Sequence, residues 1–200
     1  MAISWGVKSF PFTICVHILG VVAAVLDVTK RSRAYYEYYQ FATAILVYKS
    51  IPGSKEYKKL VHLSLQGVTL VVAIVAILAV FKFHNENGID NLYSLHSWLG
   101  LTTVILFALQ WLIGFVTFWY PGATENTRSA LKPWHIFFGL LTYGLTIAMA
   151  ESGTQEKLTF LQITSVIGRY SSEALIANSL GVTLVLLGAF VFLAVVVSSR

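Results

Sequence analysis

The chain has 200 residues, of which 56% are hydrophobic and only 12% are charged. A soluble globular domain carries about 25% charged residues, so this composition excludes that class and indicates an integral membrane protein. The net charge of +5 does not indicate nucleic-acid binding, because the basic residues stand in short groups between apolar runs, as expected of charges that orient a protein in a bilayer.

Apolar runs along the chain predict membrane-crossing helices, because a span needs about 20 predominantly apolar residues. Five runs meet this requirement: residues 10–28, 60–81, 95–119, 134–150 and 174–198. A sixth run, residues 38–48, is about half as long as a span requires and is predicted as a short helix or an interfacial segment. We therefore expect one all-α membrane domain over residues 1–200, a bundle of five full transmembrane helices plus one short helix.

Basic residues in the connecting segments predict the orientation of this bundle. If the short run does not cross the membrane, residues 29–59 form the most basic loop, which should stay in the cytoplasm. Its lysines and arginines are Lys30, Arg31, Arg33, Lys49, Lys55, Lys58 and Lys59. Residues 85–94 and 152–173 then face the opposite side, and residues 121–133 are cytoplasmic. If the short run did cross, only the first helix would invert.

Four of the five histidines fall at two membrane depths. His62 and His135 each open a span at the cytoplasmic face, about one turn inside it. At the other face His84 closes the first of these spans, about 33 Å from His62, and His96 opens the next. Histidines inside a membrane are candidate functional groups because burying them is costly, and neutral imidazole is a good axial ligand for haem iron. Alternatively, each histidine only hydrogen-bonds a neighbouring helix or reaches the interface.

Other residues of these spans bear on the chemistry. Glycines at 100, 114, 139 and 144 allow either close helix approach or room for a flat macrocycle. A proton-coupled carrier would need carboxylates within the membrane, whereas Asp27 and Glu151 lie at the ends of predicted spans. The glycines fit both possibilities, and the position of the two carboxylates argues against a proton-coupled carrier.

Four stretches of the chain carry a resemblance to a known family. They are AILVYKSIPGSKEYKKLVHLSLQ (44–66), FKFHNENGIDNLYSLHSWLGL (81–101), FALQWLIGFVTFWYPGATENTRSALKPWH (107–135) and EKLTFLQITSVIGRYSSEALIANSLGV (156–182). In these the sequence resembles the cytochrome b561 family, in particular its plant transmembrane ascorbate ferrireductases. The resemblance runs from about residue 44 to 197 and is weaker over the first helix.

The resemblance implies six helices, whose central four hold two haem b groups, one near each face, each with two histidine ligands. Residues 44–150 match this core. His62 and His135 match the ligands of the cytoplasmic haem iron, and His96 matches one ligand of the outer haem iron.

Substrate sites are also implied by the resemblance. The basic cytoplasmic region that receives ascorbate is matched by Lys49, Lys55, Lys58 and Lys59. Alternatively, these lysines serve only the positive-inside topology. His84 and Tyr93 match the outer substrate pocket.

The implied activity is electron transfer from cytoplasmic ascorbate through haem to monodehydroascorbate or a ferric chelate on the other side. The resemblance further implies a homodimer in the vacuolar membrane or another endomembrane, with the plasma membrane as the alternative.

One departure from the family lies near the second helix. In the family this helix begins with the histidine that is the other ligand of the outer haem, whereas here TKRSRAYYEYYQF passes directly into ATAILVYKS. We therefore predict a complete inner haem site and impaired transfer, with an outer haem that is absent, five-coordinate or held by another second ligand. The alternative is a non-catalytic family member that acts as a membrane interaction or regulatory subunit.

Overall fold

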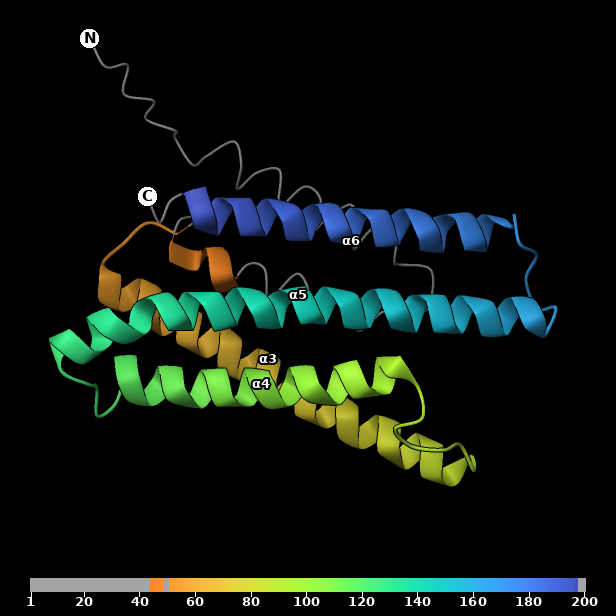
Figure 1. Cartoon of the computed structure of the whole chain (residues 1–200), viewed down its shortest axis with the longest axis horizontal. Coiled ribbons are helices and arrows are strands. Elements are labelled where there is room, and N and C mark those ends of the chain that lie inside the picture. The colour runs from red at the N-terminus through yellow and green to blue at the C-terminus, as the bar shows by residue number, and fades with distance from the viewer. Residues whose placement is uncertain (1–43, 49–50, 198–200) are drawn as a thin grey trace, which may run out of the picture.

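The computed structural model of the chain describes residues 44–48 and 51–197. The predicted helix at 10–28, the start of the predicted short helix and Lys49 lie outside the described residues. The described part contains four long helices, each apolar and long enough to cross a membrane (Figure 1). They are α3 (Lys55–Glu86), α4 (Leu95–Phe118), α5 (Glu125–Ile163) and α6 (Ser172–Val197). This confirms the prediction of an all-α, multi-pass membrane protein.

The helix bounds agree with the apolar runs for α4 and α6 but not for α5. This helix begins before the predicted 134–150 span and ends well after it, at Ile163. Residues 152–173, which the basic residues assign to the opposite side, are therefore helical over most of their length rather than an irregular loop. The apolar criterion finds only the part of a helix that lies in lipid, and good helix formers such as Gln155, Glu156 and Lys157 extend α5 beyond it. At 39 residues, α5 is about 58 Å long, so it exceeds the roughly 30 Å hydrocarbon core.

Serine and threonine side chains set the beginnings of three helices. Ser54 Oγ accepts a hydrogen bond from the backbone N–H of Tyr57 at 3.2 Å, and Ser94 Oγ accepts one from the N–H of Ser97 at 3.3 Å. Thr124 caps α5 in the same way. Each side chain satisfies one of the backbone donors that the first helical turn leaves without a partner. The caps fix where α3, α4 and α5 start relative to the histidines that they carry.

The short helical segment at 44–48 lies in the core of the bundle. Ala44 and Val47 are fully buried, and Leu46 joins one apolar cluster with residues of α4, α5 and α6. The other buried members of that cluster are Phe107, Tyr143, Leu187 and Val191. In Figure 1, α5 lies between α4 and α6, and α3 passes behind α4. This segment is therefore a packed part of the fold rather than a surface appendage.

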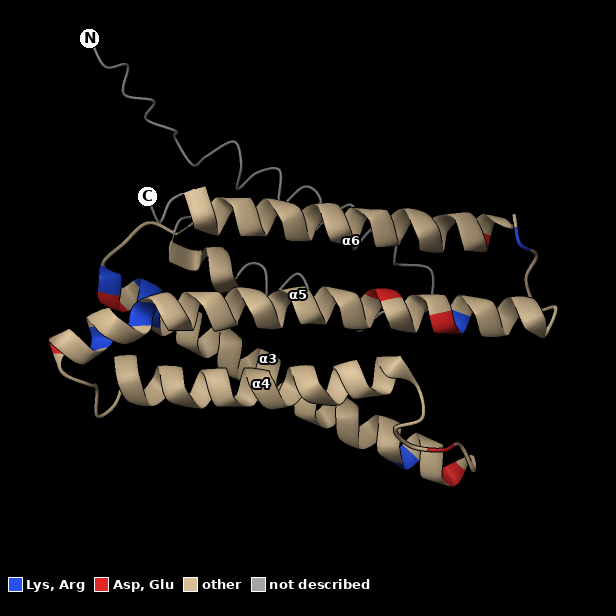
Figure 2. Ribbon diagram, in the orientation of Figure 1, with Lys and Arg blue, Asp and Glu red and all other residues tan. Residues whose placement is uncertain are grey.

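Charged residues of the described chain lie mainly at the two ends of the bundle (Figure 2). The end at which α3 and α5 begin carries five basic residues and two acidic ones: Lys55, Lys58, Lys59, Arg128 and Lys132 against Glu56 and Glu125. At the opposite end the balance reverses. The basic residues there are Lys82 and Arg169 and the acidic ones are Glu86, Asp90 and Glu173, while Glu151, Glu156 and Lys157 lie further inside α5. This asymmetry favours the basic end as the cytoplasmic one.

Candidate functional site

Two of the predicted site histidines meet at the basic end of the bundle. His62 comes from α3 and His135 from α5, and their ring centroids are 6.4 Å apart with the ring planes at 74°. Both side chains are half-buried. Residues separated by more than seventy positions in the sequence thus share one site.

Both rings are held through Nδ1. The Nδ1 of His62 lies 2.7 Å from the backbone carbonyl oxygen of Ala44, in the short helical segment. A carbonyl only accepts, so Nδ1 of His62 carries the proton and donates. The Nδ1 of His135 lies 3.0 Å from Nε2 of Gln110, in α4. Within the described residues neither Nε2 of the two histidines has a hydrogen-bond partner, which leaves these atoms for a ligand.

The separation of the two rings fits one metal ion between them. Metal–imidazole bonds are about 2 Å long, and a ring nitrogen lies about 1 Å from its ring centroid, so two imidazoles on one metal have centroids about 6 Å apart. The observed 6.4 Å matches this value. Two rings that point at one metal ion from opposite sides can each rotate about the line that joins them. The 74° angle between the ring planes is therefore compatible with a shared metal ion. His62 and His135 are therefore the residues of this end of the bundle that would hold a haem iron, with one imidazole from each of α3 and α5.

The surroundings of the pair are small or aromatic. A Cβ atom on Gly114 of α4 would lie 2.9 Å from Cε1 of His135, so only glycine leaves room for the ring at this position. The ring of Phe118 lies 5.2 Å from His135, and that of Tyr48 lies 5.9 Å from His62. Such an apolar shell suits a flat macrocycle and keeps water from the two imidazole rings.

His96 lies in a second site, on α4 near the opposite end of the bundle. Its Nδ1 lies 2.9 Å from the carbonyl oxygen of Met149 in α5 and donates to it. A Cβ atom on Gly153 of α5 would lie only 2.6 Å from Cε1 of His96, so glycine is required here too. Among the described residues no second imidazole contacts His96, so this part of the chain provides one candidate ligand at this site.

The proposed substrate residues are arranged differently at the two ends. Lys58 donates from Nζ to the carbonyl oxygen of Tyr48 at 3.1 Å, which ties α3 to the short helical segment. Lys55 is exposed and Lys59 half-buried beside it, while Lys49 lies outside the described residues. At the other end Tyr93 is 87% exposed.

The two predicted outer substrate residues are not joined in the described structure. The half-buried His84 packs its ring 6.2 Å from that of Phe83, and no hydrogen bond or ring contact links it to Tyr93 in this part of the chain. The structure therefore brings the inner lysines near the inner histidines but does not assemble His84 and Tyr93 into a pocket.

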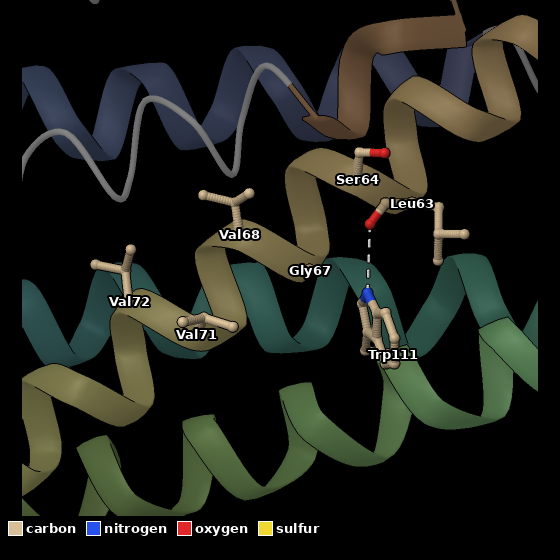
Figure 3. Close-up of a pocket in the computed structure, with 7 residues that line it drawn as sticks. All are labelled: Leu63, Ser64, Gly67, Val68, Val71, Val72 and Trp111. Atoms are coloured by element: carbon tan, nitrogen blue, oxygen red, sulfur yellow. Dashed lines mark hydrogen bonds between the residues drawn. The ribbon is translucent and has the colours of Figure 1, made fainter.

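A groove of about 420 Å³ lies between α3 and α4 (Figure 3). Its lining is Leu63, Ser64, Gly67, Val68, Val71, Val72 and Trp111. Trp111 reaches it from α4 and donates to the carbonyl oxygen of Leu63 at 3.4 Å. At 100° per residue these positions of α3 lie opposite the face that bears His62 and the buried Gln66 and Thr69. The groove therefore faces the membrane side of α3 and does not belong to the histidine pair.

The position of Glu151 in α5 differs from the position expected from the sequence. It was predicted to lie at the end of a span, but α5 continues to Ile163, so Glu151 lies within the helix. Its Oε1 is buried without a hydrogen-bond partner among the described residues, and its carboxyl group packs against Gly181 of α6. The extension of α5 past the apolar run is the physical reason for the difference.

Two residues of the histidine sites were missed from the sequence. Gln110 contacts both Nδ1 and the carbonyl oxygen of His135, and Gly153 packs against His96. A polar amide within the apolar run 95–119 was a visible signal for Gln110, because polar side chains inside membranes need partners. Gly153 had no such signal, since its position was expected in a loop.

Comparison with known proteins identifies the family to which a chain with this arrangement belongs. The profile of the eukaryotic cytochrome b561 family matches residues 38–161. Transmembrane ascorbate ferrireductase 2 of Arabidopsis thaliana is 52% identical over 153 residues, which cover 76% of this chain and 66% of that protein. This chain thus spans just under two thirds of the Arabidopsis relative in that alignment.

Other relatives align over different shares of their length. The probable ascorbate-specific transmembrane electron transporter 2 of Oryza sativa is 42% identical over 220 residues, covering 98% of this chain and 93% of the rice protein. A lysosomal membrane ascorbate-dependent ferrireductase of Rattus norvegicus is 44% identical over 165 residues, covering 80% of this chain and 64% of the rat protein. With the family profile spanning both histidine sites, the chain belongs to the eukaryotic cytochrome b561 family.

Proposed function

We propose that this protein is an ascorbate-dependent transmembrane oxidoreductase with one haem b, held between His62 and His135 at the cytoplasmic end. The observation that carries this proposal is the 6.4 Å separation of the two rings, which matches the spacing of two imidazoles on one iron. The family membership supports haem b as the group that occupies the site. When bound, haem b supplies a one-electron carrier within the membrane.

The basic end of the bundle supports ascorbate as the electron donor. Ascorbate is a monoanion, and it loses one electron and one proton to become the monodehydroascorbate radical. Lys55, Lys58 and Lys59 lie on the first turns of α3, which also carries His62. Their positive charge raises the local concentration of an anionic donor and orients it toward the inner site. The names of the Arabidopsis, rice and rat relatives each include ascorbate.

We propose further that the outer site at His96 is incomplete. The rice alignment extends over 220 residues, more than the 200 of this chain, so the rice protein has residues with no counterpart here. The Arabidopsis alignment has 153 residues and covers 76% of this chain, so it needs almost no such gaps. This pattern supports a missing stretch outside the well-matched part, as the junction between TKRSRAYYEYYQF and ATAILVYKS suggests.

The consequence is slow transfer to acceptors on the far side, monodehydroascorbate or a ferric chelate. One redox site near the inner face leaves most of the roughly 30 Å hydrocarbon core without a relay. We also place the protein in the vacuolar membrane or another endomembrane, as a homodimer. The rat relative, whose name places it in the lysosomal membrane, supports an endomembrane.

A second candidate function is a non-catalytic membrane subunit that binds or regulates intact family members. The observation in its favour is His96, which no second imidazole contacts in the described part of the chain. Retention of the complete inner pair favours the redox function over this one. Haem content separates the two, because a subunit without redox activity has no need of bound haem.

The test is reduction of the purified protein by ascorbate, measured as the fraction of the dithionite-reducible haem absorbance. We expect ascorbate to reduce the wild-type haem and the signal to disappear in His62→Ala. The matched control is His84→Ala, which removes a histidine from the opposite end of α3 and should leave the signal in place. An unchanged ascorbate-reducible signal in His62→Ala would contradict the assignment of the inner site.

A further inference from the structure

Pro52 leaves one carbonyl oxygen of the short helical segment without a backbone donor. A backbone hydrogen bond runs from the N–H of Ile51 to the carbonyl oxygen of Val47 at 3.1 Å. The equivalent donor for the carbonyl of Tyr48 would be residue 52, but proline has no N–H. Lys58 of α3 donates to this oxygen from Nζ instead, at 3.1 Å. The segment therefore ends at a carbonyl whose hydrogen-bond donor is a lysine of another helix.

A second contact joins the same two elements one turn away. His62 follows Lys58 by four residues on α3, and Ala44 precedes Tyr48 by four residues in the segment. Nδ1 of His62 donates to the carbonyl oxygen of Ala44 at 2.7 Å. The ring of Tyr48 also lies 5.9 Å from the ring of His62. Because four residues span about 6 Å along either helix, Lys58 and His62 hold the two ends of one helical turn.

This turn is packed so that it moves as one body. Ala44 and Val47 are fully buried, and the buried Leu46 belongs to the apolar cluster with residues of α4, α5 and α6. Close-packed interiors transmit a displacement rather than absorb it. A shift of the Tyr48 carbonyl therefore reaches the Ala44 carbonyl and the Tyr48 ring, which both contact His62.

We infer that Lys58 is a positioning residue of His62, because it fixes the segment that supplies both the acceptor for Nδ1 and the ring beside the imidazole. This inference rests on the proposed function, since it concerns a ligand of the proposed inner haem. An acceptor at Nδ1 orients an imidazole and strengthens it as a metal ligand. A lysine ammonium group has three donors, so Lys58 can hold the Tyr48 carbonyl and attract ascorbate at the same time.

The experiment compares two lysine variants by redox titration of the bound haem. Lys58→Met removes a charge and the bond to Tyr48. The matched control Lys59→Met removes the charge of the next residue, which makes no hydrogen bond in the described part of the chain. Loss of a positive charge lowers the midpoint potential, because it favours the oxidised haem. Loss of support at Nδ1 makes His62 a weaker donor to iron and raises the potential.

The expected result follows from these opposite signs. The potential of Lys58→Met should lie above that of Lys59→Met, and Lys58→Arg should restore the wild-type value because it keeps both the charge and a donor. A lysine with only an electrostatic role would give the two methionine variants the same potential. A purely structural role would lower the stability of Lys58→Met without separating the two potentials. Either of these results overturns the inference.

Haem retention is the second readout. Loss of a hydrogen-bond partner to a metal ligand typically weakens metal binding by about 10–100-fold. Lys58 acts on that partner through the segment, so Lys58→Met should release haem at most about tenfold faster than Lys59→Met. Equal release rates in the two variants would also count against the inference.

The outcome can be separated from failure of the proposed function. If wild-type protein binds no haem, or if His62→Ala keeps its haem, the inner site itself is wrong. If the inner site stands but the two methionine variants behave alike, only the inference about Lys58 fails. Should Lys58→Met not accumulate in folded form, Tyr48→Leu decides, because it removes the ring beside His62 and changes no charge. Faster haem release from Tyr48→Leu supports the segment as the support of His62, and release at the wild-type rate overturns it.

Discussion

The inner and outer histidine sites are built by the same packing of α4 against α5. His135 of α5 rests on Gly114 of α4, with Gln110, one turn earlier, at its Nδ1. His96 of α4 rests on Gly153 of α5, with the Met149 carbonyl, one turn earlier, at its Nδ1. Each of the two helices thus carries one histidine, and the ring of that histidine packs against a glycine of the other helix.

The two sites differ in what faces the seated ring. His62 of α3 lies opposite His135, and its own Nδ1 is held by Ala44 of the short helical segment. No second imidazole contacts His96 in the described part of the chain. The packing of α4 against α5 therefore positions one histidine at each site in the same way, and the neighbouring α3 determines that a second imidazole faces only His135 among the described residues.

The largest expected effect is on haem content when the ligands themselves are removed. His135→Ala should abolish haem binding, because it leaves His62 without a second ligand. His96→Ala should leave haem content unchanged, because the outer site holds no haem in this account. The measurement is haem per polypeptide after purification. Equal losses in both variants would show that the sites are equivalent.

The next largest effect is expected at the two glycines against which the histidine rings pack, Gly114 and Gly153. Gly114→Ala places a methyl group 2.9 Å from the His135 ring and Gly153→Ala places one 2.6 Å from the His96 ring, and each should cost about 1–3 kcal/mol through overpacking. Only Gly114→Ala should also weaken haem retention, by about tenfold. Haem dissociation rates and unfolding in detergent measure the two effects.

The control for this pair is Gly144→Ala, since a Cβ atom there has nothing within 4 Å. It should be neutral or slightly stabilising, because alanine is the better helix former. A similar loss of haem from Gly114→Ala and Gly153→Ala would contradict the difference between the sites.

A smaller effect is expected from the charge at the inner end. Lys58→Gln keeps a hydrogen-bond donor near the Tyr48 carbonyl and removes the charge, so the KM for ascorbate should rise about fivefold, since an exposed charge pair contributes ~1 kcal/mol. The increase should shrink at high salt. Lys82→Gln, on the opposite end of α3, is the matched control. Steady-state reduction kinetics decide, and an equal change in both variants would argue against an inner ascorbate site.

The smallest effect is expected at the helix caps beside the two sites. Ser54→Ala and Ser94→Ala each remove one hydrogen bond to a first-turn N–H and should each lower stability by about 1 kcal/mol. Neither should change haem content, because the caps do not contact the histidine rings. Unfolding in detergent measures the stability. Haem loss from Ser54→Ala would mean that the inner site depends on the start of α3.

Apolar runs were sufficient to predict the membrane class and the bounds of α4 and α6, because length and hydropathy alone determine where a helix crosses lipid. They did not predict the full length of α5, whose ends leave the membrane and are held by helix propensity and the Thr124 cap. Topology also placed His62 and His135 at one depth, which the ring contact now supports.

The contacts that orient the histidines could not be predicted from sequence. The carbonyls of Ala44 and Met149 are backbone groups that every residue possesses, so no sequence pattern marks them. Gln110 is a polar residue in an apolar run, but its partner on α5 depends on how the two helices are rotated about their axes. The histidines themselves could therefore be identified from the sequence, whereas the contacts that orient their rings could not, because these contacts depend on how the helices pack.

The number of haem groups bound per polypeptide in the purified wild-type protein tests the central claim most directly. The account predicts a value near one, with the single haem between His62 and His135. A value near two would contradict it by showing a complete outer site at His96. A value near zero would contradict it equally, by showing that the paired imidazoles of α3 and α5 hold no haem.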